Sequence, residues 1–187
     1  MIVTADVLVR HHFSVADFHR MGEVGILPAD RRVELIEGDC IAMAPMGSWH
    51  IVRLTALHEQ LVLALAGRAV VSSQIPVQLG NYSEPEPDIV VLRHPLSRYE
   101  TRPPATGDVH WLVEIADSTA RSDREVKVPL YARHGIPEVW LLDREAGRLV
   151  VYREPGAGGY GQVREYRDGS VSPLAFADVV VEVGKLL

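Results

Sequence analysis

Residues 109–115, Val-His-Trp-Leu-Val-Glu-Ile, form the segment that most restricts how this chain can fold. Apart from Glu114, apolar residues dominate both sets of alternating positions, so a β-strand here must be covered on both faces. A sheet with helices on both sides provides such cover, which predicts an α/β fold. Glu114 then needs a cation, a proton or a bound metal, because an unpaired buried carboxylate costs several kcal/mol.

A second carboxylate, Asp88, begins another apolar stretch. It follows residues 83–87, Ser-Glu-Pro-Glu-Pro, and precedes Ile-Val-Val-Leu, which predicts the first residue of a strand. If the two strands are antiparallel neighbours, the start of one lies beside the end of the other, and Asp88 and Glu114 reach the same ion. Two oxygen ligands with waters suit Mg²⁺ or Mn²⁺ better than zinc. The spacing equally allows Asp88 to cap a turn and Glu114 to pair with an arginine.

A helix is predicted after the Glu114 strand. Residues 122–125, Ser-Asp-Arg-Glu, form a capping box that opens a helix to about His134, and Gly135 ends it. Pro129 lies inside this helix, where it frees the carbonyl of Glu125 and bends the axis. In the other interpretation, the regular helix starts only near Pro129.

Lys127 lies in the first turns of this helix. The connection from the strand is short, so the helix returns close to the end of the strand and a long lysine reaches the two carboxylates. An ammonium there holds or activates a water; the alternative is a solvated helical lysine. Tyr131, four residues further on, shares the face of Lys127.

Short helices and β-branched strands make up most of the remaining sequence. We expect helices at residues 15–21 and 48–66, a hairpin over residues 33–43, and strands at residues 69–71, 75–79, 88–92, 138–143, 148–153, 160–166 and 179–181. The N-terminal helices are expected on one face of the sheet and the helix from Ser122 on the other. No internal repeat or long linker divides residues 1–187, which predicts a single domain.

Composition narrows the class of protein. The net charge of −6 excludes a protein that coats nucleic acid by charge alone, so any contact with nucleic acid must be local. The single cysteine, Cys40, can form neither an internal disulfide nor a multi-thiolate zinc site, which favours a reducing compartment. The chain has no signal-like start and no apolar run near the about 18 residues that cross a bilayer, so we expect a cytoplasmic protein.

Three stretches resemble the Uma-type family of endonucleases, a member of the PD-(D/E)XK, or restriction-endonuclease-like, superfamily. They are residues 83–88, 112–118 and 123–140, within a wider resemblance from about Phe13 to Tyr152. The resemblance implies a restriction-endonuclease-like core, in which helices flank a twisted mixed β-sheet. An N-terminal hairpin and C-terminal strands are additions to this core.

The resemblance also implies a catalytic set of Asp88, Glu114, Lys127 and Glu34. Pro87-Asp88 matches the Pro-Asp of the superfamily motif, Glu114 matches its second acid, and Lys127 matches a lysine that this family carries on the following helix. Ala116 stands where the usual lysine of the superfamily would be. Glu34 matches an acid near the N-terminal hairpin, as a further metal ligand or an orienting group; the alternative is a solvated strand charge.

The implied cofactor is Mg²⁺, or Mn²⁺, held by Asp88, Glu114 and the main-chain carbonyl of Ile115. The implied substrate-binding residues are Arg121, Arg124, Tyr131 and Gln74. Arg121 and Arg124, with Arg133, add positive charge for phosphate contacts, although a solvated helix face is the simpler interpretation. His50 also matches the family pattern, without an assigned role.

The expected function is a Mg²⁺-dependent endodeoxyribonuclease. Its partners are expected to be DNA and a second copy of the chain in a two-fold homodimer, with the apolar residues 179–187 as a contact. Two alternatives stay open. One is a catalytically silent nuclease-like module that binds nucleic acid or a protein partner, supported by the net charge and by Ala116. The other is a metal-dependent phosphoesterase that acts on small molecules.

Overall fold

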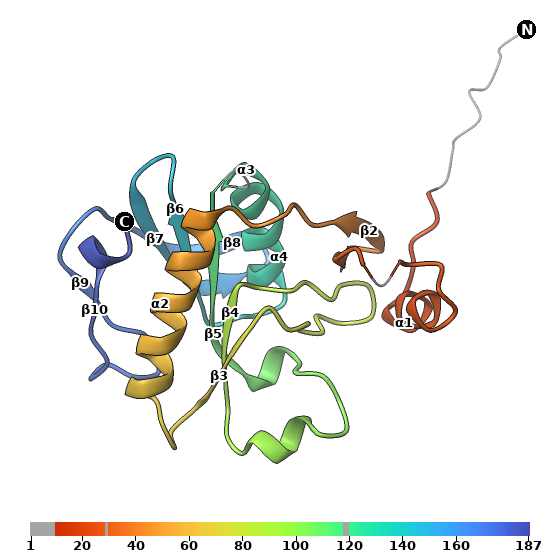
Figure 1. The fold of residues 1–187 in the computed structure, drawn as a ribbon, viewed down its shortest axis with the longest axis horizontal. Coiled ribbons are helices and arrows are strands. Elements are labelled where there is room, and N and C mark those ends of the chain that lie inside the picture. Colours follow the sequence, from red (N-terminus) through yellow and green to blue (C-terminus); the bar gives the residue numbers. More distant parts are fainter. Residues whose placement is uncertain (1–9, 29, 118–119) are drawn as a thin grey trace, which may run out of the picture.

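The computed structural model describes residues 10–28, 30–117 and 120–187. Its centre is a six-stranded sheet with the order β3-β4-β5-β6-β7-β8 (Figure 1). The strands are β3 (Val70–Ser73), β4 (Ile89–Leu92), β5 (Val109–Ala116), β6 (Glu138–Asp143), β7 (Arg148–Gly156) and β8 (Gly159–Tyr166). Strands β5 and β6 run parallel, and every other neighbouring pair is antiparallel. The predicted mixed α/β sheet is therefore confirmed.

Helices cover both faces of the sheet, as the apolar β5 segment requires. Helix α2 (Ser48–Ala64) covers one face, where Leu57 and Leu61 share a core with Trp111 of β5. Helix α4 (Val128–Arg133) covers the other face, where Tyr131 shares a second core with Leu112. Side chains alternate between the two faces of a strand, so Glu114 lies on the same face as Leu112, towards α4.

The segment before α4 is an irregular helix. It consists of α3 (Ala120–Ser122) and the π-helical turn η3 (Asp123–Lys127), and it continues directly into α4. The N–H of Val128 donates to the carbonyl of Asp123, five residues earlier. Pro129 has no N–H to offer the carbonyl of Glu125, so the wider turn accommodates the proline. The predicted disturbance at Pro129 is therefore present, as a π-helical turn.

The predicted capping box at residues 122–125 is wrong. Ser122 has helical backbone angles, φ −62° and ψ −46°, instead of the extended angles of an N-cap residue. Helical structure already begins at Ala120, so Ser122 is not at the start of the helix. Glu125 instead accepts a hydrogen bond from Arg121 at 3.0 Å, one helical turn away.

The predicted strand at residues 75–79 is also wrong. The N–H groups of Val77 and Leu79 donate to the carbonyls of Pro85 and Ser83. The facing segment contains two prolines, Pro85 and Pro87, which have no N–H to return and so cannot complete a regular ladder.

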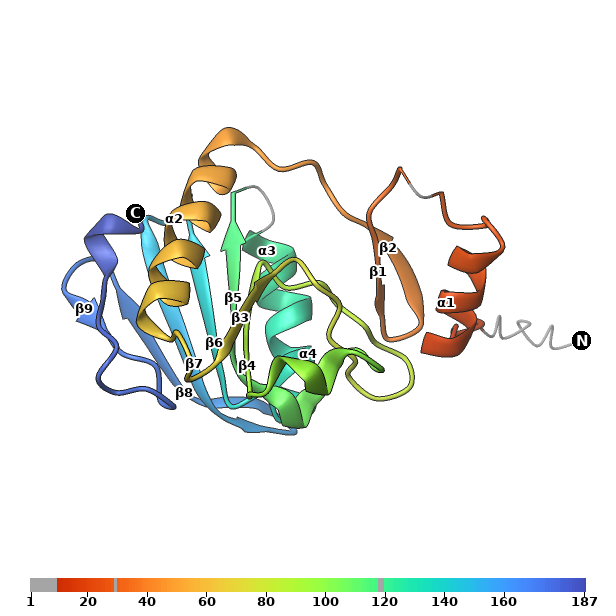
Figure 2. The same cartoon turned by 60° about the horizontal axis from the view of Figure 1, so that its bottom comes forward.

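The first helix does not cover the sheet, contrary to prediction. Helix α1 (Val15–Glu23) lies with the hairpin of β1 (Val33–Ile36) and β2 (Asp39–Ala42), far from α2 in both views (Figures 1 and 2). Main-chain hydrogen bonds attach this unit to the loop before β4. The N–H of Val15 donates to Asn81, and the N–H of Gly38 donates to Tyr82.

The C-terminal segment packs on the chain's own core. Strands β9 (Ser170–Val171) and β10 (Val181–Glu182) pair with each other, and Val179, Val183 and Leu186 are buried in the core of the α2 face. Val180 in the same segment is 54% exposed, so the expectation that residues 179–187 provide a dimer contact stays a prediction that rests on a smaller apolar surface.

Three 3₁₀ helices complete the secondary structure of the described residues. They are η1 (Leu96–Tyr99), η2 (Thr106–Asp108) and η4 (Val183–Lys185). None of the helices within residues 10–28, 30–117 and 120–187 has the length and apolar character needed to cross a membrane.

Candidate active site

The antiparallel pairing of β4 and β5 brings Asp88 and Glu114 to the same end of the sheet. Ile89 pairs with Val113, so Asp88, just before β4, is level with Glu114. The side chain of Asp88 accepts a hydrogen bond from the main-chain N–H of Ile115 at 2.7 Å. The prediction that these two strands are antiparallel neighbours is confirmed.

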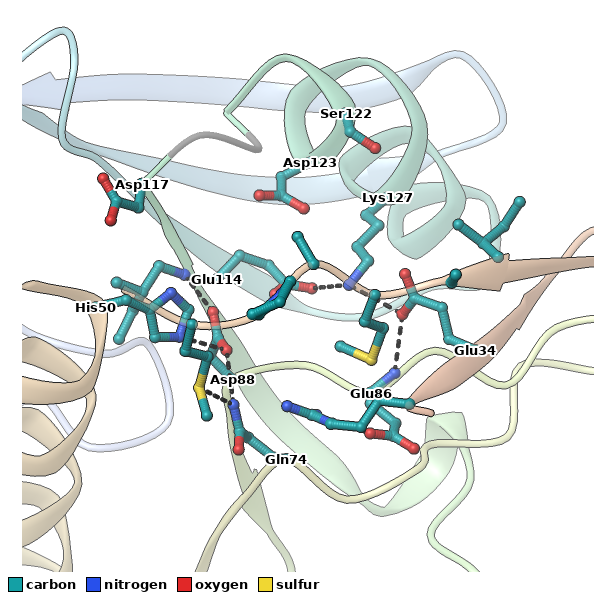
Figure 3. Close-up of a pocket in the computed structure, with 18 of the residues that line it drawn as sticks. Glu34, His50, Gln74, Glu86, Asp88, Glu114, Asp117, Ser122, Asp123 and Lys127 are labelled. Carbon is teal, nitrogen blue, oxygen red and sulfur yellow. Dashed lines mark hydrogen bonds and ion pairs between the residues drawn. The ribbon is translucent and has the colours of Figure 1, made fainter. Parts of the chain in front are cut away.

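Both carboxylates line a pocket of about 200 Å³ (Figure 3). The pocket is built from the β1–β2 hairpin, the start of α2, the start of β4, the end of β5, and η3. Its polar lining consists of Arg32, Glu34, His50, Gln74, Glu86, Asp88, Glu114, Asp117, Ser122, Asp123 and Lys127. Ile115 and residues 41–47 complete the wall.

Lys127 enters this pocket from η3. Its Nζ lies 3.0 Å from Oε2 of Glu34 and 3.5 Å from Oε1 of Glu114 (Figure 3). Burial lowers the pKa of Lys127, but the carboxylates of Glu114, Glu34 and Asp123 outweigh burial and raise the pKa above its ordinary value. The side chain is therefore an ammonium that donates hydrogen bonds, and it is not a general base.

Glu114 lies at the bottom of the pocket, almost completely buried. Burial raises the pKa of Glu114 to about 8, although Lys127 opposes this shift. Its Oε1 also accepts a hydrogen bond from the hydroxyl of Tyr131 at 2.5 Å. A carboxyl group with this pKa holds a proton at neutral pH, and a divalent cation would displace that proton.

Glu34 reaches the pocket from β1, on the side opposite the sheet. Its Oε2 accepts a hydrogen bond from the main-chain N–H of Glu86 at 3.2 Å, in addition to the ion pair with Lys127. Glu34 is buried, so the alternative of a solvated strand charge is wrong.

The pocket carries more negative than positive charge. Its carboxylates are Glu34, Glu86, Asp88, Glu114, Asp117 and Asp123, and its lysine and arginine side chains are Lys127 and Arg32. Carboxylate and carbonyl oxygens are the ligands that hard divalent cations prefer, so the donor set fits Mg²⁺ or Mn²⁺. No three His, Cys, Asp or Glu side chains among the described residues form a ready metal cluster. The lining groups that could hold a cation together with water are the carboxylates of Asp88 and Glu114 and the main-chain carbonyl of Ile115.

His50 orients Asp88, although the sequence assigned it no role. Its Nε2 lies 2.9 Å from Oδ1 of Asp88, and this hydrogen bond raises the pKa of His50. Nε2 of Gln74 lies 3.4 Å from the same oxygen. His50 and Gln74 are 38 and 14 residues away from Asp88 in the sequence, so no local sequence pattern indicates these contacts.

Asp123 and Asp117 also line the pocket, although neither was predicted as a site residue. Asp123 precedes Lys127 by four residues. This helical spacing is the sequence feature that indicates that both side chains lie on the same face. Asp117 directly follows β5 and pairs with Arg144 at 2.6 Å.

The predicted substrate-binding residues do not come together. Gln74 lines the pocket, but Tyr131 is fully buried beside Glu114. Arg121 pairs with Glu125, and Arg124 lies 3.8 Å from Asp143; both arginines are outside the pocket lining. The geometry of Tyr131 fits a residue that positions Glu114.

These features define an α/β protein with an acidic pocket at one end of a mixed sheet. Residues 15–183 match the Uma2 family, described as "Putative restriction endonuclease", and the chain belongs to this family. The resemblance noted in the sequence is thereby confirmed.

A solved structure shares the fold. It is the crystal structure of "a putative nuclease belonging to DUF820" from Anabaena variabilis ATCC 29413. The TM-score is 0.68 and the sequence identity is 20%, over 89% of this chain and 96% of that chain. The search of curated proteins found no match.

Proposed function

We propose that this chain hydrolyses phosphodiester bonds of DNA with Mg²⁺, or Mn²⁺, held by Asp88, Glu114 and the main-chain carbonyl of Ile115. The observation that carries the proposal is the ammonium of Lys127 3.5 Å from Glu114, in a pocket that also contains Asp88. The family and the fold support a nuclease in general. The ion, the DNA substrate, a homodimer and a cytoplasmic location remain predictions.

When bound, the cation would polarise a phosphoryl oxygen and lower the pKa of a water ligand. The hydrogen bonds from Ile115 and His50 hold Asp88 in place for this role. Lys127 donates hydrogen bonds to the attacking water or to a phosphate oxygen. The oxygen of the water bonds to phosphorus while the bond from phosphorus to the leaving sugar oxygen breaks; the water loses a proton to solvent, and the leaving sugar oxygen takes up a proton from solvent.

Two buried groups position the reacting side chains. Glu34 holds Nζ of Lys127 from the hairpin side at 3.0 Å, and the hydroxyl of Tyr131 donates to Glu114 at 2.5 Å. Lys127 thus supplies an amine in the pocket although Ala116 occupies the usual lysine position on the strand. This arrangement favours an active nuclease over a catalytically silent module.

Cleavage of circular DNA tests the proposed function. With Mg²⁺, the protein is expected to nick supercoiled plasmid and to cut circular single-stranded DNA, and EDTA should stop both reactions. Asp88→Asn should lower either rate at least about a hundredfold, because it removes a charge from the cation site. Asp168→Asn, at an exposed position outside the pocket, is the matched control.

Other outcomes would favour the other functions. Hydrolysis of small phosphate diesters without DNA cleavage would indicate the small-molecule phosphoesterase. A calorimetric titration in which neither Mg²⁺ nor Mn²⁺ binds in a way that depends on Asp88 and Glu114 would indicate the silent module.

Pro129→Ala is expected to lower cleavage at least about tenfold without lowering the melting temperature. The alanine N–H can bond to the carbonyl of Glu125, which allows η3 to become regular α-helix and turns Lys127 away from Glu114. Alanine also favours helix more than proline does. Val126→Ala, at an exposed position in the same turn, is the control. Plasmid cleavage and thermal unfolding are the measurements, and unchanged cleavage by Pro129→Ala would contradict the positioning role of the turn.

A further inference from the structure

One wall of the pocket is apolar. Residues 41–47, Ile-Ala-Met-Ala-Pro-Met-Gly, lead from the end of β2 to the start of α2 and line the pocket along their whole length. We call this segment the strap. Ile41 and Met46 are large apolar residues, yet 43% and 39% of their surface is exposed. The carboxylates and Lys127 thus share the pocket with a row of uncovered apolar side chains.

The strap is tied to the site by specific contacts. Sδ of Met46 accepts a hydrogen bond from Nε2 of Gln74 at 2.9 Å, and the same amide nitrogen lies 3.4 Å from Asp88 (Figure 3). At the other end, the N–H of Met43 donates to the carbonyl of Arg32 at 3.0 Å. The apolar wall therefore has a defined position beside the proposed cation site.

The pocket offers little positive charge for a nucleic-acid backbone. Arg32 pairs with Glu86 at 2.8 Å, and Lys127 pairs with Glu34 at 3.0 Å. Proteins that bind duplex DNA gain most of their affinity by neutralising phosphates with lysine and arginine. Single strands offer another source of affinity, because the faces of their unpaired bases stack on aromatic side chains, and bases taken out of the stack also pack on apolar ones.

We propose that the strap binds a nucleobase of single-stranded DNA, next to the phosphate that reacts at Asp88 and Glu114. The proposal rests on the proposed nuclease function and names its substrate class. An unpaired nucleotide has a base with an apolar face and a charged phosphate. The strap would contact the base, and the groups around Asp88 and Glu114 would act on the phosphate. A pocket of about 200 Å³ also favours a single unstacked base over a base pair, which would first have to open.

Binding measurements with three labelled DNAs test this proposal. They are an oligothymidine of about 12 nucleotides, the same length of abasic strand, and the oligothymidine paired with oligoadenosine. Binding is measured by fluorescence anisotropy in the presence of Ca²⁺. Like Mg²⁺, Ca²⁺ is a hard cation that takes oxygen ligands. The single strand with bases is expected to bind at least about tenfold more tightly than the other two.

Variants of the strap give the second part of the test. Ile41→Ser and Met46→Ser, singly and together, should remove the preference for bases and leave binding of the abasic strand unchanged. Leu174→Ser is the matched control, because Leu174 is 56% exposed and lies outside the pocket lining. Thermal unfolding of every variant confirms that it is folded.

The outcomes separate this inference from the proposed function. Equal affinity for the three DNAs, tighter binding of the duplex, or an equal loss in Leu174→Ser would overturn the role of the strap. Asp88-dependent cleavage without a preference for bases would support the proposed nuclease function and refute the role of the strap. A preference for bases that requires Ile41 and Met46, in a protein that cleaves no DNA, would support base binding and refute the nuclease.

Discussion

Replacing Lys127 with alanine is expected to lower the rate of DNA cleavage at least about a hundredfold, because the pocket loses its buried hydrogen-bond donor. The ammonium lies 3.0 Å from Glu34 and 3.5 Å from Glu114. Arg32, which also lines the pocket, is paired with Glu86 and cannot take over its place. Initial rates with plasmid and with single-stranded DNA measure the effect.

The same change should weaken the metal-free protein. Removing one partner of a buried ion pair costs about 3–5 kcal/mol, because the remaining charge is left without compensation. Lys127→Ala leaves Glu34 in this position, and Mg²⁺ should restore part of the lost free energy of unfolding. Urea unfolding with and without Mg²⁺ measures this effect.

Lys185→Ala is the control for Lys127→Ala, since Lys185 forms an exposed pair with Glu182. Its cleavage rate and its free energy of unfolding should match those of the unmodified protein. Full cleavage by Lys127→Ala, in a protein that is folded, would show that the amine has been assigned to the wrong side chain.

Replacing Glu114 with glutamine is expected to abolish Mg²⁺ binding and cleavage, because one of the two carboxylate ligands loses its charge. In the unmodified protein, Mg²⁺ affinity should fall more than about tenfold between pH 8 and pH 6. Burial raises the pKa of Glu114 to about 8, so at lower pH the cation must displace a proton. Calorimetric titrations at both pH values measure the affinity and the released proton.

The metal-free protein should show the opposite dependence on pH in its stability. The pKa of Glu114 is raised from 4.5 to about 8 in the folded chain, so between these values the folded chain keeps a proton that the unfolded chain has lost. The free energy of unfolding therefore falls as the pH rises through this range. Glu114→Gln should lose this part of the slope, whereas Glu145→Gln, at an exposed position, should keep it. An unchanged slope in Glu114→Gln would contradict the raised pKa.

Local sequence patterns were sufficient to predict the strands that position the two carboxylates of the site. The apolar β5 segment predicted a sheet covered on both faces, and the starts and ends of two strands predicted that Asp88 and Glu114 are neighbours. Strand boundaries depend on residues close together in the sequence, and the register of β4 and β5 then follows from pairing. The role of Glu34 came from the family resemblance, whereas Lys127 was already indicated by the short connection between the Glu114 strand and the following helix; both side chains line the pocket.

Other features depend on contacts between distant segments. His50 reaches Asp88 across 38 residues, and Tyr131 reaches Glu114 across 17 residues. The position of α1 depends on a hydrogen bond from Val15 to Asn81 in the loop before β4, which no helical pattern indicates. The π-helical turn was missed because the Ser-x-x-Glu pattern resembles a helix start, whereas helical structure already begins at Ala120.

The amine and the proposed ion ligands belong to different parts of the backbone. Asp88 and Glu114 are set by β4 and β5, and Lys127 is set by η3 and the proline that follows it. A substitution in the helix can therefore change turnover while cation affinity stays constant, and a substitution in the strands can do the reverse. Turnover and ion affinity are thus free to diverge independently among descendants of this sequence.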